Sequence, residues 1–161
     1  MKKVFCLLLL CAGACFGAEV NLIPAPFKGW YNPEKARVKV DSGILTITAN
    51  PDPKVNGYQK AQAAIPLKGS ALKGKKFELS FKYRTGKLYG AVQISIRQTC
   101  SKGGSYHGKK LTRWDVSKEW KEVKHTFSTR CDTKTLGFYL VGYYMKEGEK
   151  VEIKDLKLTA L

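Results

Sequence analysis

Basic and aromatic side chains alternate over residues 102–121, and this segment has the clearest capacity for binding chemistry. Its cations surround the rings of Tyr106, His107 and Trp114. Its cations are Lys102, Lys109, Lys110, Arg113, Lys118 and Lys121. Flat rings stack on the apolar faces of sugars and bases, and cations attract anionic groups. The segment therefore indicates an anionic, ring-bearing ligand, and lysine charge that only keeps the protein soluble is the simpler alternative.

Side chains that could catalyse a reaction are few. The chain has two histidines, His107 and His125, and no HExxH, GxSxG or P-loop pattern. Ser105 lies close to His107 in sequence but has no evident third partner for nucleophilic catalysis. Tyr106, His107 and Arg97 are residue types with which a lyase can abstract a proton beside a sugar carboxylate. We expect a protein that is not an enzyme, with a small polysaccharide lyase using Tyr106, His107 and Arg97 as the alternative.

The N-terminal residues have the three parts of an export signal. Lys2 and Lys3 precede an apolar run over 4–10, and the small residues Ala12-Gly13-Ala14 follow it. The apolar run is too short to span a bilayer, so we expect no membrane span.

Cleavage of this signal is expected within 14–18. Residues 1–18 then form the signal peptide, and residues 19–161 form one domain, which is a typical length for a single core. The residues before Cys15 loosely resemble a lipobox, so a lipid-anchored protein of the outer surface is the alternative to a secreted or periplasmic one.

The chain is strongly basic, with 29 Lys+Arg against 13 Asp+Glu and a formal net charge of +16. Loss of the two signal lysines leaves 27 basic against 13 acidic residues, or +14. Outside the cell, an acidic polysaccharide meets this charge better than nucleic acid does, so we expect no nucleic-acid partner. We expect a monomer.

Two of the five cysteines, Cys100 and Cys131, lie outside the signal region. In an exported domain such a pair usually forms a disulfide, which would stabilise the fold by roughly 3–4 kcal/mol. Two buried free thiols are the alternative.

The segments that must position these residues read as short strands. Residues 76–84 and 91–99 alternate apolar and polar side chains with the period of a strand. Further strands are expected at 36–40, 44–48, 58–67, 120–130, 136–145 and 151–158. We expect a loop over 101–110, a hairpin joining the strands at 120–130 and 136–145, and a β-bulge at Asp155. The fold class is an all-β, two-sheet antiparallel sandwich.

The alternation of apolar and polar residues in each expected strand also predicts which side chains face the core and which face outward. If Phe138 and Leu140 face the core, then Tyr139 and Tyr143 face outward. Outward positions on other strands are Gln93, Arg97 and Tyr58. Trp114 follows the Gly-rich segment and is either an exposed platform or a lid on the core.

Short stretches along the chain match a known pattern. They are Asn21-Leu22-Ile23, Phe27-Lys28-Gly29-Trp30, Ile44-Leu45-Thr46-Ile47, Tyr58-Gln59-Lys60-Ala61-Gln62, Phe77–Arg84, Trp120–Phe127, Gly137-Phe138-Tyr139-Leu140 and Ile153–Leu158. Their order and spacing over residues 21–160 resemble the jelly-roll carbohydrate-binding modules of the family 4, 9 and 22 type, within the galactose-binding-like superfold.

This resemblance implies a jelly roll with a glycan site on a concave sheet face or in the loops at its edge. It also implies a structural calcium ion in many members, for which Asp155 matches one ligand position. Lys28 stands where the N-terminal acid is usual, so we expect no cofactor, with a structural calcium ion as the alternative.

Together these features predict a secreted, non-catalytic protein that binds an acidic or otherwise polar polysaccharide. Trp114 and Tyr106 are expected to stack on the sugar, and Arg97, Gln93 and His107 to hydrogen-bond it. Tyr139, Tyr143 and Tyr58 complete the predicted ligand-binding set. An envelope or adhesion module that binds protein partners is the alternative from a different class.

Overall fold

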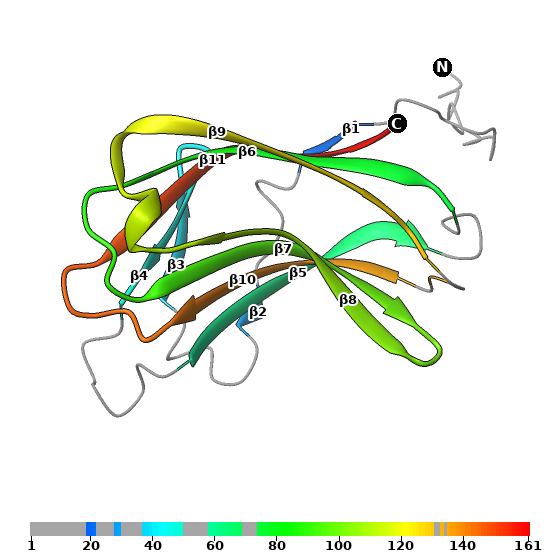
Figure 1. Cartoon of the computed structure of the whole chain (residues 1–161), viewed down its shortest axis with the longest axis horizontal. Helices are drawn as coiled ribbons and strands as arrows, with labels where there is room; N and C mark the ends of the chain where they lie inside the picture. Colours follow the sequence, from blue (N-terminus) through cyan, green and yellow to red (C-terminus); the bar gives the residue numbers. More distant parts are fainter. Residues whose placement is uncertain are drawn as a thin grey trace, which may run out of the picture.

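The computed structural model describes residues 37–49, 74–130, 133 and 135–161, and the backbone of 19–21, 28–29 and 58–68. Its described residues form two antiparallel sheets packed face to face, with one short 3₁₀ helix, η2 (Arg113–Asp115) (Figure 1). The predicted all-β sandwich of jelly-roll type is therefore confirmed.

The two sheets are built from eleven described strands. In order across the six-stranded sheet lie β3 (Arg37–Asp41), β4 (Ile44–Thr48), β11 (Lys150–Ala160), β6 (Lys76–Thr85) and β9 (Ser117–Ser128), with β1 (Glu19–Asn21) paired to β11. In order across the five-stranded sheet lie β2 (Lys28–Gly29), β5 (Tyr58–Lys68), β10 (Thr135–Tyr143), β7 (Ala91–Cys100) and β8 (Gly103–Leu111).

The core lies between the sheets and follows the period-two pattern. On β6 the inward side chains are Phe77, Leu79, Phe81 and Tyr83, all of them buried. On β7 they are Val92, Ile94, Ile96 and the polar Gln98. Burial of apolar area at about 25 cal/mol per Å² makes these inward rows the main source of stability. The same pleat turns the intervening residues of each strand to the outer faces.

A β-bulge interrupts β11, as predicted. The pairing of β11 with β6 shifts between Lys154 and Lys157, and Asp155 has a φ of 53°. Val151 and Ile153 face the core before the bulge, and Leu156 and Leu158 face it afterwards. The extra residue therefore restores the inward position of the apolar side chains.

The loop predicted over 101–110 is wrong, because most of this segment is strand β8, which pairs with β7 from Val92↔Leu111 to Cys100↔Gly103. β8 is an edge strand of the five-stranded sheet, so one of its backbone edges has no partner strand among the described residues. Leu111 is its one buried residue, and its other positions are exposed or half-buried. A polar, Gly-rich edge strand lacks the apolar alternation that distinguishes a strand from a loop in sequence.

The hairpin predicted between the strands at 120–130 and 136–145 is also wrong. β9 pairs with β6, whereas β10 pairs with β5 and β7, so the connection crosses from one sheet to the other. The backbone N–H of Thr129 donates to the carbonyl of Lys75 at 2.8 Å, which holds one end on the six-stranded sheet. The amide of Gln98 donates to the hydroxyl of Thr133 at 2.6 Å, which holds the other end on the five-stranded sheet.

The predictions for residues 1–18, including Cys15, lie outside the described residues, and so does Cys131. The sulfur of Cys100 lies 3.9 Å from the carbonyl oxygen of Arg130, the neighbour of Cys131 in sequence. The Cys100–Cys131 disulfide stays a prediction. Within the described residues, no helix has the length and apolar character needed to cross a membrane.

Gly108 allows β7 and β8 to approach closely. A Cβ atom at Gly108 would collide with the carbonyl oxygen of Ile94 and lie 2.7 Å from the Cα of Ser95. We expect Gly108→Ala to lower the free energy of unfolding by about 1–3 kcal/mol, measured by urea denaturation. Gly86→Ala is the matched control, because a Cβ there meets nothing within 4 Å. Equal stability of the two variants would contradict this packing.

Candidate functional site

The outer face of the five-stranded sheet gathers most of the predicted site residues. Arg97 of β7 is the cross-strand partner of Tyr106 on β8 and of Gly137 on β10. Gln93 lies four residues along β7 and is paired with Val141. Alternation within each strand places five predicted residues on this one face. They are Gln93, Arg97, Tyr106, Tyr139 and Tyr143.

Tyr58 is brought to the same region by the register. Its backbone pairs with that of Tyr143 between β5 and β10. The structure describes only the backbone of β5, so Tyr58 is placed by its position in the sheet.

Arg97, Tyr106 and Tyr139 form one cluster on this face. Nη1 of Arg97 donates a hydrogen bond to the hydroxyl of Tyr139 at 3.2 Å. The guanidinium carbon lies 5.9 Å from the ring centroid of Tyr106 and 5.7 Å from that of Tyr139. The two rings meet edge to face with centroids 5.6 Å apart. Cation–π and ring–ring contacts therefore hold the guanidinium in place.

The two tyrosines of this cluster differ in access to water. Tyr106 is 49% exposed, whereas Tyr139 is 7% exposed. Tyr106 can therefore offer its ring to a ligand. Tyr139 instead supports Arg97 from below, and its place in the predicted ligand-binding set stays a prediction.

A second cluster lies along the same face. The hydroxyl of Tyr143 donates to Oε1 of Gln93 at 2.9 Å, and the Gln93 amide donates to the hydroxyl of Ser95 at 3.2 Å. The ammonium of Lys110 lies 5.0 Å from the ring centroid of Tyr143. Burial, helped by the nearby Tyr106, raises the pKa of Tyr143, so its hydroxyl remains a hydrogen-bond donor.

This face carries cations and no acid among its described outward positions. Those positions on β7, β8 and β10 are Ala91, Gln93, Ser95, Arg97, Thr99, Gly104, Tyr106, Gly108, Lys110, Thr135, Gly137, Tyr139, Val141 and Tyr143. On the opposite sheet carboxylates lie among the outward cations, as where Arg84 contacts Glu152 at 2.7 Å and Lys82 contacts Asp155 at 3.0 Å. The described outward positions of the five-stranded sheet thus carry positive charge without a carboxylate of their own, which suits an anionic ligand.

Lys110 was not among the predicted site residues. It lies on the same side of β8 as Tyr106, four residues further on. The strand period would have placed it on this face, but the segment was read as a loop.

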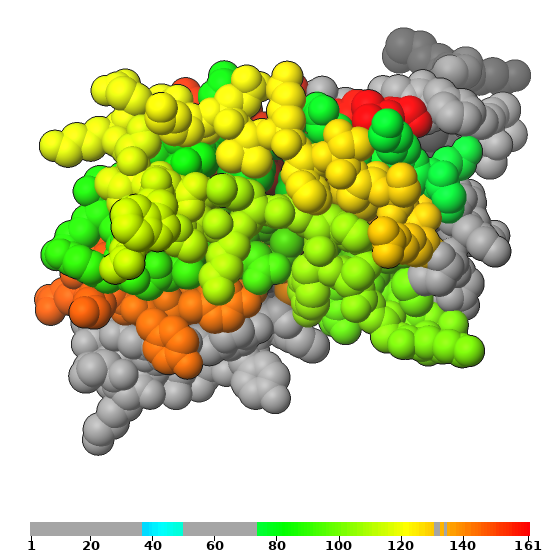
Figure 2. Space-filling model, in the orientation of Figure 1, coloured from blue at the N-terminus to red at the C-terminus, as the bar shows by residue number. Residues whose placement is uncertain are grey.

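His107 does not join this face. Its ring stacks on Phe127 of β9 with centroids 4.5 Å apart, and Nε2 lies 2.9 Å from the Ser105 hydroxyl and 3.2 Å from Oε1 of Gln98. Figure 2 shows β8 and β9 (yellow-green and yellow) adjoining along this side of the sandwich. Burial lowers the pKa of His107 and disfavours its charged form. The Tyr106 and His107 of the lyase hypothesis thus point to opposite sides of β8.

Trp114 is 81% exposed, so it is not a lid on the core. It lies in η2, beyond the end of β8, with the guanidinium of Arg113 4.5 Å from its ring centroid. Five residues of strand separate Tyr106 from Leu111, which is about 17 Å of extended chain.

Asp115 holds η2 in place. Its carboxylate accepts hydrogen bonds from the backbone N–H of Thr112 at 2.9 Å and the Thr112 hydroxyl at 3.0 Å. The ammonium of Lys109 lies 2.8 Å away. Burial alone would raise the pKa of Asp115, but the hydrogen bonds from Lys109 and Thr112 outweigh it and lower the pKa. The pKa of Lys109 is raised mainly by its hydrogen bond to Asp115.

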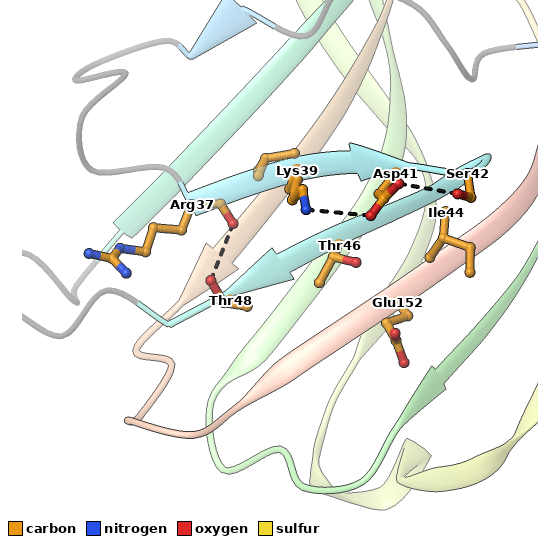
Figure 3. Close-up of a pocket in the computed structure, with 9 residues that line it drawn as sticks. Arg37, Lys39, Asp41, Ser42, Ile44, Thr46, Thr48 and Glu152 are labelled. Atoms are coloured by element: carbon orange, nitrogen blue, oxygen red, sulfur yellow. Dashed lines mark hydrogen bonds and ion pairs between the residues drawn. The ribbon is translucent and has the colours of Figure 1, made fainter.

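A pocket of about 450 Å³ lies on the outer face of the six-stranded sheet (Figure 3). Its lining residues are Arg37, Val38, Lys39, Asp41, Ser42, Ile44, Thr46, Thr48 and Glu152. No aromatic ring lines it, and its two carboxylates already contact cations: Asp41 lies 3.4 Å from Lys39, and Glu152 contacts Arg84. This pocket lacks the stacking surface that the other face has.

Asp155, the residue that the resemblance offers as a calcium ligand, is already paired with a cation, and the calcium ion stays a prediction. The Asp155 carboxylate lies 3.0 Å from the ammonium of Lys82, and no group of three His, Cys, Asp or Glu residues in the described part of the chain could hold a metal ion. A calcium ion needs several oxygen ligands and is repelled by a neighbouring ammonium.

No family model and no curated protein matches the chain. Solved structures do match it. A family 4 carbohydrate-binding module is 16% identical, with a TM-score of 0.56 over 91% of this chain and 96% of that one. The CBM22-1 xylan-binding domain of Xyn10C from Paenibacillus barcinonensis is 12% identical, with a TM-score of 0.54 over 83% and 85%.

A cyclase from Fischerella sp. TAU matches at 12% identity, with a TM-score of 0.54 over 73% of this chain and 63% of that one. At such identities these matches show a shared fold. The chain has the jelly-roll fold of carbohydrate-binding modules.

The contacts of Asp115 predict a pH-dependent contribution to stability. Because its pKa is lowered by folding, Asp115 stabilises the protein above the ordinary carboxyl pKa of about 4, and this contribution is lost as the pH falls through the lowered value. We expect Asp115→Asn to lower the free energy of unfolding by roughly 1–2 kcal/mol near neutral pH and by much less near pH 2. Denaturant titrations at both pH values measure this difference.

The control is Glu119→Gln, which neutralises an exposed carboxylate that makes no ion pair with a described residue. An effect of Asp115→Asn that is equal at both pH values would contradict the proposed charge contribution.

Proposed function

We propose that the protein is secreted, does not catalyse a reaction, and binds an acidic or otherwise polar polysaccharide on the outer face of the five-stranded sheet. The observation that carries this proposal is the gathering of Tyr106, Arg97, Gln93 and Tyr143 on one face with no described carboxylate beside them. The fold supports it, because one structural neighbour is named as a xylan-binding domain.

Each of these side chains supplies one part of sugar recognition. The exposed ring of Tyr106 provides a flat apolar surface for the C–H face of a pyranose. Gln93 and Tyr143 are already oriented by their mutual hydrogen bond and present polar groups to sugar hydroxyls. Arg97 and Lys110 attract the acidic groups of the polymer. A chain that extends along β8 would reach Trp114 at its far end.

Absence of catalysis is part of this proposal and is supported by the separation of Tyr106 from His107 across β8. A lyase would release an unsaturated uronate, which absorbs ultraviolet light. Appearance of that absorbance on incubation with a uronate polymer would contradict the proposal.

An adhesion module for protein partners is the second candidate. The connection between β6 and β7, the helix η2 and the connection between β10 and β11 lie at the same end of the sandwich (Figure 1). Each carries one exposed ring, namely Tyr89, Trp114 and Tyr144. Exposed aromatic residues are enriched at protein interfaces. Failure to bind any glycan on an array would favour this candidate.

Replacement of Tyr106 tests the proposed face. We expect Tyr106→Ala to weaken binding to an acidic polysaccharide by about 1–3 kcal/mol, because the stacking surface is lost. Isothermal titration calorimetry measures the affinity. Trp120→Ala is the control, since Trp120 lies on the outer face of the other sheet between Arg84 and Lys154. Equal losses in the two variants, with both proteins folded, would contradict the assignment of this face.

Secretion also implies that Cys100 and Cys131 are oxidised. We expect the exported protein to be two mass units lighter than its fully reduced form and to contain no reactive thiol. We expect reduction to lower the free energy of unfolding by roughly 3–4 kcal/mol. Two free thiols in the freshly exported protein would contradict this prediction.

A further inference from the structure

We infer that Arg97 determines the specificity of this face by binding the carboxylate of an acidic sugar through two parallel N–H groups. This inference rests on the proposed function, and it narrows the ligand from acidic or polar polysaccharides to polymers that carry carboxylates. Tyr139 acts as a positioning residue for Arg97.

The orientation of the guanidinium is set before any ligand arrives. Nη1 donates to the Tyr139 hydroxyl at 3.2 Å, and the rings of Tyr106 and Tyr139 lie within 6 Å of the guanidinium carbon. Tyr139 itself is buried, so the acceptor that orients Arg97 is fixed in the sheet. An arginine held in this way loses little conformational freedom when it binds, which favours affinity and directional recognition.

Part of the hydrogen-bonding capacity of Arg97 is unused. Nε is buried and has no hydrogen-bond partner in the described structure. Among the described residues, it is the only buried side-chain nitrogen or oxygen without a partner. Nη2 is not among such atoms and has no bond to a described residue, so it reaches the solvent. No described carboxylate pairs with this guanidinium. A buried N–H without a partner costs stability. Nη2, in contrast, is open to a ligand.

Nη2 reaches the solvent, and Nη1 has a second N–H besides the one that it donates to Tyr139. Two such N–H groups in one plane match the two oxygens of a carboxylate, an arrangement that a lysine cannot provide. Arg97 is therefore suited to bind a carboxylate. The neighbouring ring of Tyr106 is suited to stack on the sugar that carries this carboxylate.

The spacing of charge on the face also limits the ligand. Among the described outward positions, Arg97 and Lys110 are the cations. Arg97 is level with Tyr106, and Lys110 lies four residues further along β8, or about 13 Å of strand. Lys60 and Lys28 stand at register positions on the same side of the sheet, as the partners of Val141 and Gln62. Cations spread over several strands suit an extended polymer better than a small anion.

The test compares three polymers on the whole protein by isothermal titration calorimetry. They are polygalacturonate, the same polymer after reduction of its carboxylates, and dextran sulfate. Four proteins are compared, namely wild type, Arg97→Lys, Tyr139→Phe and Lys118→Gln. Arg97→Lys keeps the charge and removes the planar fork. Tyr139→Phe removes only the orienting hydroxyl. Lys118→Gln removes one exposed charge on β9, away from the face.

We expect wild type to prefer polygalacturonate to its reduced form by about tenfold or more, and Arg97→Lys to lose most of that preference. Tyr139→Phe should reduce the preference, and Lys118→Gln should leave it unchanged. The ratio of affinities for the two polymers is the readout, because general destabilisation would lower both affinities together. Thermal melts confirm that each variant is folded.

Three results would overturn the inference while the proposed function stands. They are equal binding of the two polymers by wild type, a preference that survives both Arg97→Lys and Tyr139→Phe, and tighter binding of dextran sulfate that weakens equally in Arg97→Lys and Lys118→Gln. Failure of wild type to bind any polysaccharide on a wider array would instead contradict the proposed function itself.

Discussion

The pleat of the five-stranded sheet is the constraint on which the rest of the structure depends. Each of β7 and β10 must bury one row of side chains against the six-stranded sheet, and Val92, Ile94, Ile96 and Phe138 do so almost completely. The same geometry turns the alternate residues to the outside, where Gln93, Arg97, Tyr139 and Tyr143 lie. A shift of one residue in the register would exchange the two sets, so stability of the core and composition of the outer face are set together.

Polar contacts across the strands then organise the outer face. Tyr139 orients Arg97, and Tyr143 orients Gln93, in each case with one partner on β10 and the other on β7. These bonds lie on top of a rigid, buried sheet, which suits a site that must hold its shape without a ligand. The charges on the opposite sheet behave differently, because Arg84, Lys82 and Lys150 each contact a carboxylate. The opposite face therefore carries carboxylates among its cations, whereas the described outward positions of β7, β8 and β10 carry none.

Much of the fold could be predicted from sequence because alternation is strong wherever a strand covers the core. Residues 76–84 and 91–99 show it clearly, and the change of phase near Asp155 predicts the bulge. β8 could not be recognised, since an edge strand with Gly103, Gly104 and Gly108 has no apolar row to reveal it. The pairing of β9 and β10 with different sheets depends on long-range contacts, such as that between Gln98 and Thr133. Local sequence does not contain that information.

In the candidate site, too, local alternation could be predicted from sequence, whereas the arrangement of the strands could not. Gln93, Arg97, Tyr139 and Tyr143 were predicted to face outward, and the register brings them together. Tyr106 and His107 were grouped because they are neighbours in sequence, yet neighbours in a strand point to opposite sides. Trp114 was expected just after a loop that holds Tyr106, whereas it lies in η2, beyond the end of strand β8. The order of the strands and the length of each strand therefore decided which predicted residues lie together.

The central claim is that the outer face of the five-stranded sheet is the ligand-binding surface. The most direct measurement is an NMR titration of the isotope-labelled protein with a soluble acidic oligosaccharide. The account predicts that chemical-shift changes concentrate at the outward positions of β7, β8 and β10, centred on Arg97 and Tyr106. Changes confined to the six-stranded sheet, or confined to η2 and the neighbouring connections, would contradict it.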